Sequence, residues 1–214
     1  MKYGAIKGVR FFIFDCDGVL FDSRRANLEY YNKICTLAGR PPITHHEFAY
    51  VHMHTAEESV KYLFRDYPDL LSHALGITKA LSYGEFMRYM KFDPVLPLVL
   101  DELKRLGINM AISTNRSTTM PLIIKIFRLD RWFDYTCCAL DVERPKPHPE
   151  GVYKIMRFFG ASPRECIYIG DSVVDQEVSK RASIPLVAYR NPALNARFHV
   201  KHFLDLLRIA RSIV

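Results

Sequence analysis

The sequence predicts an α/β protein whose parallel sheet is interrupted, after its first strand, by an inserted helical subdomain. Short apolar runs alternate with helical patterns along most of the chain, which is typical of parallel sheets with right-handed crossovers. Residues 22–92 break this alternation with one helical pattern after another. Hydrophobic residues make up 49% of the chain and charged residues 25%, so it can bury a substantial core and is neither disordered nor fibrous.

The strands of the predicted sheet are short runs rich in apolar, β-branched and aromatic residues. The first run, residues 9–14, ends at Asp15 and has the composition of a strand that is buried on both faces. Similar runs recur at residues 108–112, 135–139, 166–169 and 185–189. Since helical segments separate them, we expect these strands to run parallel to one another.

Helices are predicted between the strands wherever apolar residues recur at helical spacing. Residues 98–106 carry such a stripe, and Gly107 follows them as a C-cap. Residues 149–159 carry a second stripe that closes at Gly160. These helices provide crossovers between successive strands of the predicted sheet.

The inserted subdomain is predicted over residues 22–92, because no convincing strand is present there and the segment is too long for a plain loop. Helical patterns cover residues 24–38, 44–51, 55–65 and 82–91. The expected organisation is therefore an α/β core built from residues 1–21 and 93–214, with a helical domain of residues 22–92 between its two parts.

The net charge of +7 indicates either a nucleic-acid partner or an attraction for small anionic substrates. The chain has no clusters in which basic and aromatic residues alternate, which disfavours nucleic acid. The basic C-terminal region contains an amphipathic helix, residues 203–210. We expect it to pack on the core with Arg208 and Arg211 outward rather than to bind a membrane.

Several sequence features predict a soluble cytoplasmic protein. No stretch approaches about 18 consecutive apolar residues, the length that predicts a membrane-spanning helix. Residues 1–4 lead into an apolar run broken by Asp15 and Asp17, which is unlike a signal peptide. The five cysteines are odd in number and contain no CxxC pair, which favours reduced thiols over disulfides or zinc. Both a monomer and a homodimer are compatible with these features.

Two aspartates follow directly after the first predicted strand. Asp15 and Asp17 are two positions apart in extended backbone, so they can face the same side while Cys16 points away. Gly18 then permits a sharp turn. Two carboxylates this close are unfavourable without a cation or a proton between them, and the carboxyl edge of an open α/β sheet is where such folds bind ligands.

Three further groups of polar residues are expected at the same edge of the sheet. Thr114 and Asn115 close the second strand of the core and could hold an anionic oxygen. Lys146 lies in a loop stiffened by three prolines. Asp171 ends a later strand, and Asp175 follows one helical turn after it. Taken singly, each could be a helix cap or a solvated loop residue.

Together and in this order, these residues resemble the four signature motifs of the haloacid dehalogenase (HAD) superfamily. The matching motifs are DxDG at residues 15–18, the Thr-Asn pair at 114–115, Lys146, and GDxxxD at 170–175. The resemblance spans the chain and implies a HAD-like three-layer α/β core, with the helical segment as a C1 cap. Residues 14–23 are similar to the opening of the phosphoglycolate phosphatase and β-phosphoglucomutase branch.

The resemblance implies a chemical role for each motif. Asp15 is expected to attack phosphorus and form an aspartyl-phosphate. Asp15 and Asp171, with the backbone carbonyl of Asp17, are expected to bind Mg²⁺, and Asp175 to orient this shell. Lys146 is expected to neutralise charge on the nucleophile and on the transferring group.

Two roles concern the substrate more directly. Thr114 and Asn115 are expected to bind oxygens of the substrate phosphate, and Asp17 to act as general acid and base. The presence of Asp17 favours phosphate-ester chemistry, because superfamily members that cleave carbon–halogen or carbon–phosphorus bonds generally lack an acid there.

The resulting functional prediction is a Mg²⁺-dependent phosphatase acting on a small phosphorylated metabolite. A β-phosphoglucomutase-like phosphosugar mutase is the alternative enzyme, and a non-catalytic phosphate-binding protein is the alternative of another class. The intact acidic and basic motifs disfavour the latter.

Residues that could set substrate specificity lie mainly in the predicted cap. His52 and His54 occupy the place where relatives often carry a glycine-containing loop, and no glycine is present here. Arg24 lies near the expected hinge, and Arg116 directly follows the Thr-Asn motif. Each could contact substrate, although a solvated residue is an equally valid interpretation for the cap positions.

Overall fold

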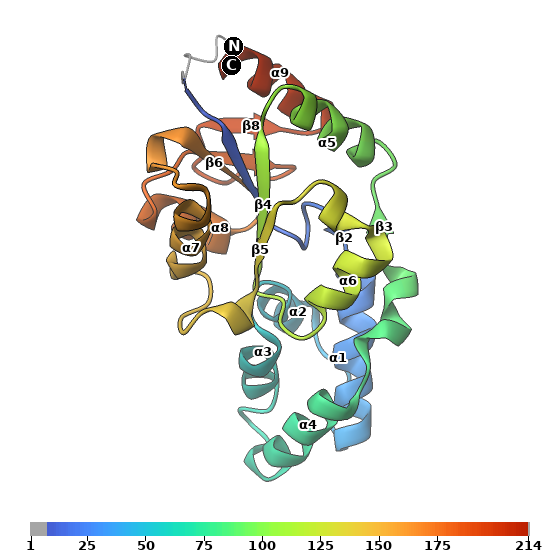
Figure 1. Ribbon diagram of the computed structural model, residues 1–214. Coiled ribbons are helices and arrows are strands. Elements are labelled where there is room, and N and C mark those ends of the chain that lie inside the picture. Colours follow the sequence, from blue (N-terminus) through green and yellow to red (C-terminus); the bar gives the residue numbers. More distant parts are fainter. Residues whose placement is uncertain (1–7, 214) are drawn as a thin grey trace.

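A parallel sheet of six strands organises the part of the chain that the computed structural model describes, residues 8–213. Residues 1–7 and 214, which the predicted core domain includes, lie outside the described residues. The strand order is β5-β4-β1-β6-β7-β8 (Figure 1). Their bounds are β1 Phe11–Phe14, β4 Asn109–Ser113, β5 Tyr135–Cys137, β6 Cys166–Gly170, β7 Leu186–Tyr189 and β8 Phe198–Val200. The central position of β1 places the residues that follow it between β4 and β6.

Alternation of side chains along the strands divides the hydrophobic core into two layers. Phe12 and Phe14 belong to one buried cluster, and Phe11 and Ile13 belong to the other. The first cluster includes residues of α5 Leu96–Arg105, α6 Met120–Phe127 and α9 Leu204–Ile213. The second includes residues of α7 Glu150–Phe159 and α8 Val173–Arg181. The core is therefore a helix–sheet–helix sandwich, as the sequence predicted.

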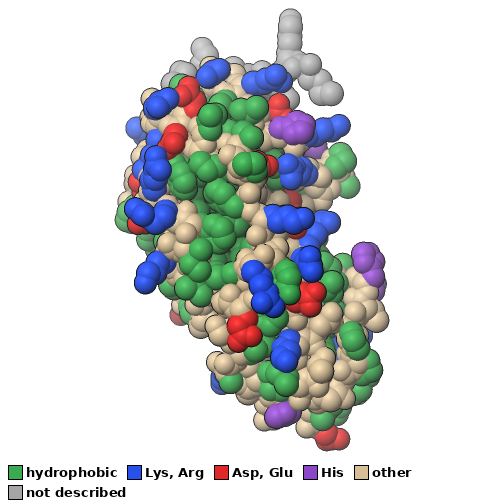
Figure 2. Space-filling view, turned by 90° about the vertical axis from the view of Figure 1, so that its right-hand side faces the viewer, with side chains coloured by type: hydrophobic (Ala, Val, Ile, Leu, Met, Phe, Trp, Pro, Cys, Tyr) green, Lys and Arg blue, Asp and Glu red, His purple; other side chains and the backbone are tan. Residues whose placement is uncertain are grey.

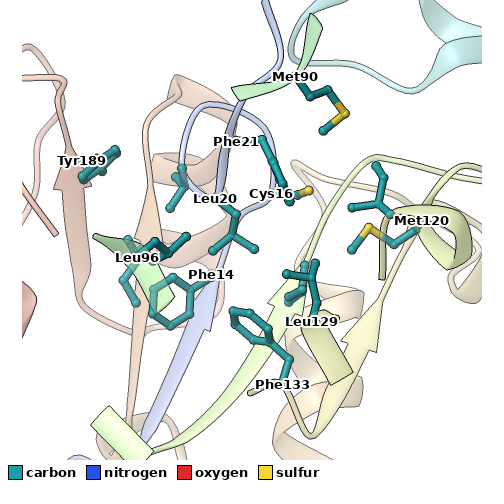
Figure 3. Packing of buried hydrophobic residues seen from close by; sticks show 14 of the residues in the cluster. Phe14, Cys16, Leu20, Phe21, Met90, Leu96, Met120, Leu129, Phe133 and Tyr189 are labelled. Atoms are coloured by element: carbon teal, nitrogen blue, oxygen red, sulfur yellow. The ribbon is translucent and has the colours of Figure 1, made fainter. Parts of the chain in front are cut away.

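Aromatic and aliphatic side chains close the first of these layers. Figure 3 shows Phe14 directed toward Leu96 and Phe133, and the rings of Phe14 and Phe133 meet edge to face at 5.6 Å. Strand β1 is buried throughout, as its apolar sequence indicated. This packing fixes the end of β1 from which Asp15 emerges.

A helical segment lies beyond the carboxyl end of the sheet (Figure 1). It contains α1 Arg24–Ala38, α2 His45–Val51, α3 Ala56–Leu63, α4 Pro68–Ala80 and the 3-10 helix η1 Tyr83–Tyr89. Capping boxes begin two of these helices: Thr44 pairs with Glu47 at α2, and Thr55 pairs with Glu58 at α3. These caps stabilise the short helices that face the edge of the sheet.

Two short antiparallel strands join the helical segment to the sheet. β2 Phe21–Asp22 pairs with β3 Lys91–Phe92. The rings of Phe21 and Phe92 lie 5.2 Å apart, and Phe127 packs against Phe21 at 4.5 Å. The chain therefore enters and leaves the helical segment through one two-stranded ribbon, against which aromatic rings pack.

The five predicted strands are confirmed, but several other expectations are corrected. The prediction that residues 22–92 contain no strand is wrong, because part of the β2–β3 ribbon falls there. A strand of two residues is too short to show the alternation of side chains by which a strand is predicted from a sequence. The helical pattern predicted over residues 82–91 corresponds to the 3-10 helix η1 followed by β3. The elements that were not predicted also include α4, α6 and β8.

The surface and the thiols agree with the sequence expectations. No helix among residues 8–213 combines the length and apolar character needed to cross a bilayer. All five cysteines are free thiols. Arg208 and Arg211 of α9 are exposed, whereas Leu206 and Ile209 are buried. On the face shown in Figure 2, Lys and Arg side chains are dispersed around an apolar area rather than gathered in one patch.

Candidate active site

The carboxyl ends of three neighbouring strands bring the predicted motifs together. Asp15 follows β1, Thr114 follows β4, and Asp171 follows β6. The register aligns Phe14 with Ile112 on one side and with Ile169 on the other, so these strands end at the same level. Parallel pairing of the strands therefore brings residues that are far apart in the sequence together in one cluster.

Lys146 is the centre of this cluster. Its Nζ lies 2.7 Å from Asp15 Oδ1, 2.8 Å from Asp175 Oδ1 and 3.0 Å from the Tyr168 hydroxyl. The lysine is buried, which by itself lowers its pKa, but Asp15 and Asp175 outweigh this effect and raise the pKa well above its ordinary value. The side chain is therefore a permanent cation beside the predicted nucleophile.

Asp175 holds Lys146 and has little capacity left for other partners. Its Oδ1 accepts from Lys146 and from the Tyr168 hydroxyl. Its Oδ2 accepts from the backbone N–H groups of Asp171 and Ser172, and from the Ser172 hydroxyl at 2.6 Å. The side chain is fully buried. This geometry suits a residue that orients the site rather than one that contacts a ligand.

Tyr168 is a site residue that the sequence analysis did not identify. It lies in β6, is fully buried, and donates from its hydroxyl toward the Ser113 carbonyl oxygen at 3.2 Å or Asp175 at 3.1 Å. A hydroxyl inside a strand that is buried on both faces needs a polar partner. That requirement was the available signal, since the surrounding residues are apolar.

Three carboxylates form a potential metal site. Oxygens of Asp15, Asp171 and Asp175 all lie within 4.8 Å of one another. Burial and the charge of Asp175 raise the pKa of Asp15 to about 7, and burial with the charges of Asp175 and Asp15 raises that of Asp171 to about 8. The single charge of Lys146 does not compensate these carboxylates. The site therefore has the electrostatic character of one that binds a cation through oxygen ligands.

Gly18 makes this approach of carboxylates possible. Its φ of +82° is in the left-handed region, and a Cβ atom on it would lie 2.0 Å from Asp171 Oδ2. The turn after Asp17 thus needs a residue without a side chain both for its backbone and for the space that Asp171 occupies.

Asp17 is paired with Arg116. Its Oδ1 accepts from Arg116 Nη2 at 2.6 Å and from the Ser23 hydroxyl. Burial alone raises the pKa of Asp17, but the Arg116 guanidinium and these hydrogen bonds outweigh it and keep the pKa below its ordinary value. The ion pair between Asp17 and Arg116 was not anticipated from the sequence.

The two residues of the Thr-Asn motif have different surroundings. Thr114 Oγ1 accepts from the Arg116 N–H, so its hydroxyl hydrogen is still available to an anion. Asn115 donates from Nδ2 to the carbonyl oxygens of Met53 and Lys146, and its Oδ1 accepts from the Lys146 N–H. The side-chain amide of Asn115 therefore holds the Lys146 loop, and the binding of phosphate by Asn115 stays a prediction.

A cavity of about 1380 Å³ lies between this cluster and the helical segment. Its lining includes the candidate specificity residues His52, His54, Arg24 and Arg116. His54 stacks on Tyr50 at 3.8 Å and its Nδ1 bonds to the Tyr50 carbonyl, whereas Arg24 is exposed. The cavity gives each predicted residue access to a small molecule.

The parallel sheet and the acidic cluster at its carboxyl edge agree with the resemblance of the sequence motifs to the HAD superfamily. A family model described as Haloacid dehalogenase-like hydrolase matches residues 12–189, and the chain therefore belongs to this family. A HAD-superfamily hydrolase of subfamily IA, variant 1, from Geobacter sulfurreducens is 32% identical; the match covers 97% of this chain and 99% of that chain, with a TM-score of 0.77.

Two further similarities are more distant or shorter. A β-phosphoglucomutase from Clostridium difficile shares the fold, with 18% identity, a TM-score of 0.78 and coverage of 95% and 97%. Pyrophosphatase PpaX from Bacillus cereus is 36% identical over 74 residues, which is 34% of either chain. The chain thus matches about a third of the length of this curated relative.

The contact between Gly18 and Asp171 can be tested against a matched glycine. Gly107 also has a positive φ, +78°, but no atom lies within 4 Å of its Cβ position. Gly18→Ala and Gly107→Ala should each lose roughly 1–2 kcal/mol of stability through backbone strain. Only Gly18→Ala should also weaken Mg²⁺ binding, by about tenfold or more. Calorimetric titration and thermal unfolding check this, and equal Mg²⁺ affinities in the two variants would contradict it.

Binding of a divalent cation at these carboxylates, measured with Mg²⁺, should depend on pH in a defined direction. The pKa values of Asp15 and Asp171 are raised to about 7 and about 8, so protons compete with the cation at lower pH. Affinity should therefore increase as the pH rises from 6 to 9, with release of protons at neutral pH. Titration calorimetry in buffers of different ionisation enthalpy measures this release. An affinity that is independent of pH would show that these carboxyls do not bind the ion.

Proposed function

We propose that the protein is a Mg²⁺-dependent phosphatase that hydrolyses a small phosphorylated metabolite through an aspartyl-phosphate on Asp15. The observation that carries this proposal is the 2.7 Å contact between Lys146 Nζ and Asp15 Oδ1, inside a cluster that also contains Asp171. A buried carboxylate with a fixed cation beside it can approach an anionic phosphoryl group, which an isolated carboxylate would repel.

Phosphoryl transfer is proposed to occur in two steps. An Asp15 carboxylate oxygen forms a bond to phosphorus while the bond to the leaving oxygen breaks, and Asp17, which must enter this step in its protonated form, donates its proton to that oxygen. In the second step a water oxygen attacks phosphorus, Asp17 takes a proton from it, and the bond between Asp15 and phosphorus breaks. Lys146 and the Thr114 hydroxyl stabilise the charge on the phosphoryl oxygens in both steps.

The residues present fit a bound Mg²⁺. Asp15 and Asp171, together with the backbone carbonyl of Asp17, would supply hard oxygen ligands, and Asp175 would orient them. When bound, the cation neutralises charge on the nucleophile and the transferring group. The raised pKa values of Asp15 and Asp171 show how unfavourable these carboxylates are as anions without such a charge.

The helical segment, residues 22–92, is proposed to be a cap that closes over the core. Hydrogen bonds that cross from one part to the other include those of Asn115 Nδ2 to the Met53 carbonyl at 3.1 Å and of Arg116 Nη2 to the Tyr83 hydroxyl at 3.2 Å. The cavity that they border would bind the substrate and exclude water during transfer. The pyrophosphatase name of a curated relative supports phosphate chemistry at this site.

Replacement of the nucleophile tests the proposal. Asp15→Asn should reduce phosphate release from a panel of phosphorylated metabolites with Mg²⁺ on the order of 10⁴-fold or more, because an amide is a poor nucleophile toward phosphorus. Asp22→Asn is the matched control, since Asp22 is an exposed aspartate nearby in sequence. Activity retained by Asp15→Asn would refute the assignment.

The same panel separates the alternative functions. Interconversion of phosphosugars without net phosphate release would indicate a mutase. Binding of Mg²⁺ and phosphate without turnover of any ester would indicate a non-catalytic protein.

A further inference from the structure

Arg116 is a buried cation whose hydrogen-bonding capacity is only partly used. Its side chain is 7% exposed and lines the cavity. Nη2 donates to Asp17 Oδ1 and to the Tyr83 hydroxyl, and Nη1 donates to Thr119 Oγ1 at 3.3 Å. Its Nε is buried without any hydrogen-bond partner among the described residues. A guanidinium presents a planar fork of N–H donors that suits anions with two oxygens. Among the described residues, the only charged partner of Arg116 is one oxygen of the Asp17 carboxylate.

A second unpartnered nitrogen belongs to another residue that lines the same cavity. Four buried side-chain nitrogen or oxygen atoms of residues 8–213 have no partner, and two of them, Arg116 Nε and His52 Nε2, belong to cavity-lining residues. Buried polar atoms are rarely left unsatisfied in folded proteins. Two such atoms on residues that line one cavity therefore indicate a polar ligand.

Hydrogen bonds around Asn27 define His52 as a donor. The Tyr83 hydroxyl donates to Asn27 Oδ1 at 2.5 Å, which directs Asn27 Nδ2 toward His52 Nδ1 at 3.0 Å. Because Nδ2 can only donate, Nδ1 accepts, and the ring hydrogen is placed on Nε2. Burial lowers the pKa of His52, which favours this neutral form. Both unpartnered atoms are thus N–H donors and call for an acceptor.

The two buried cations of the site have separate positions. Lys146 contacts Asp15 and Asp175, on the side of the proposed nucleophile. Arg116 contacts Asp17, the proposed acid, which must lie beside the leaving oxygen. Arg116 and His52 are therefore placed to meet the part of the substrate that leaves, rather than the phosphoryl group that is transferred.

We propose that Arg116 and His52 form a subsite for a second anionic group on the substrate, a carboxylate or phosphate carried by the leaving group. This inference rests on the proposed phosphatase function and specifies its substrate class: phosphate esters or anhydrides whose leaving group bears its own negative charge. An anion in the subsite accepts from Arg116 Nε and His52 Nε2, and it competes with Asp17 for the guanidinium. Binding of the correct leaving group thereby loosens the ion pair that holds Asp17.

A pair of substrates that differ by one charge tests the subsite. Phosphoglycolate carries a carboxylate where 2-hydroxyethyl phosphate carries a neutral hydroxymethyl group, and both transfer the same phosphoryl group. The wild-type protein should favour phosphoglycolate by about 100-fold in kcat/KM. Arg116→Gln and His52→Gln should each bring this ratio toward one, and Arg116→Lys should retain part of it because it keeps the charge.

Arg25→Gln is the control for these variants. Arg25 is an exposed arginine of α1 that packs over Tyr89 at 4.6 Å and does not line the cavity. It should keep the wild-type ratio. Thermal unfolding of each variant verifies that it is folded, and the ratio of the two substrates cancels any general loss of active protein.

The outcomes separate the subsite from the proposed function. Hydrolysis of both compounds by the wild-type protein without preference would overturn the subsite and leave the phosphatase proposal standing. An equal loss on both substrates in Arg116→Gln and His52→Gln would also overturn it, since the residues would then be structural. Absence of turnover with every phosphorylated compound would overturn both proposals.

Discussion

The contacts of the buried Lys146 ammonium with Asp15 and Asp175 are the interaction on which the rest of the site depends. Four aspartates converge at one edge of the sheet, and burial makes each of them unfavourable as an anion. Asp175 is stabilised by Lys146, Tyr168 and the start of α8. Asp15 receives the same lysine, yet its pKa is still raised to about 7. The remaining imbalance is what a divalent cation would neutralise.

The residues around the four aspartates accommodate the close approach of these carboxylates. Gly18 leaves room for the Asp171 carboxylate, and Asn115 fixes the backbone of Lys146 from both sides of its amide. The parallel register of β1 with β4 and β6 brings the strand ends to one level. The side chains that approach the substrate are therefore held by groups that do not approach it themselves. Such a site is organised before the substrate arrives, which is the condition for electrostatic catalysis.

The second buried cation of the site, Arg116, contacts a different aspartate from those that Lys146 contacts. Lys146 is associated with the proposed nucleophile, and Arg116 with the proposed acid. Hydrogen bonds through Tyr83 and Asn27 extend the Arg116 side of the site to His52 in the helical segment. The helical segment and Asp17 are therefore linked through one chain of polar contacts.

Much of this arrangement could be predicted from the sequence, because it depends on strand ends. The apolar run before Asp15 and the matching run before Thr114 defined the sheet edge, and the family motifs identified the residues there. The ion pair of Asp17 with Arg116 could not be predicted, because it joins positions 99 residues apart through side-chain geometry. Tyr168 was obscured by its apolar neighbours, and β2 and β3 were too short to show periodicity. The contacts of the Asn115 amide with the Lys146 backbone could not be predicted either, because an amide that holds a loop and one that binds an anion look alike in a sequence.

Chemical trapping of the phosphorylated protein tests the central claim most directly. Borohydride reduces an aspartyl-phosphate to the alcohol and releases phosphate, which converts that aspartate to homoserine. When turnover is quenched with this reagent, peptide mass spectrometry should find homoserine at position 15 in place of Asp15, and only when substrate and Mg²⁺ are both present. Conversion at Asp171 or Asp17 instead, or no conversion under conditions of active turnover, would contradict the account.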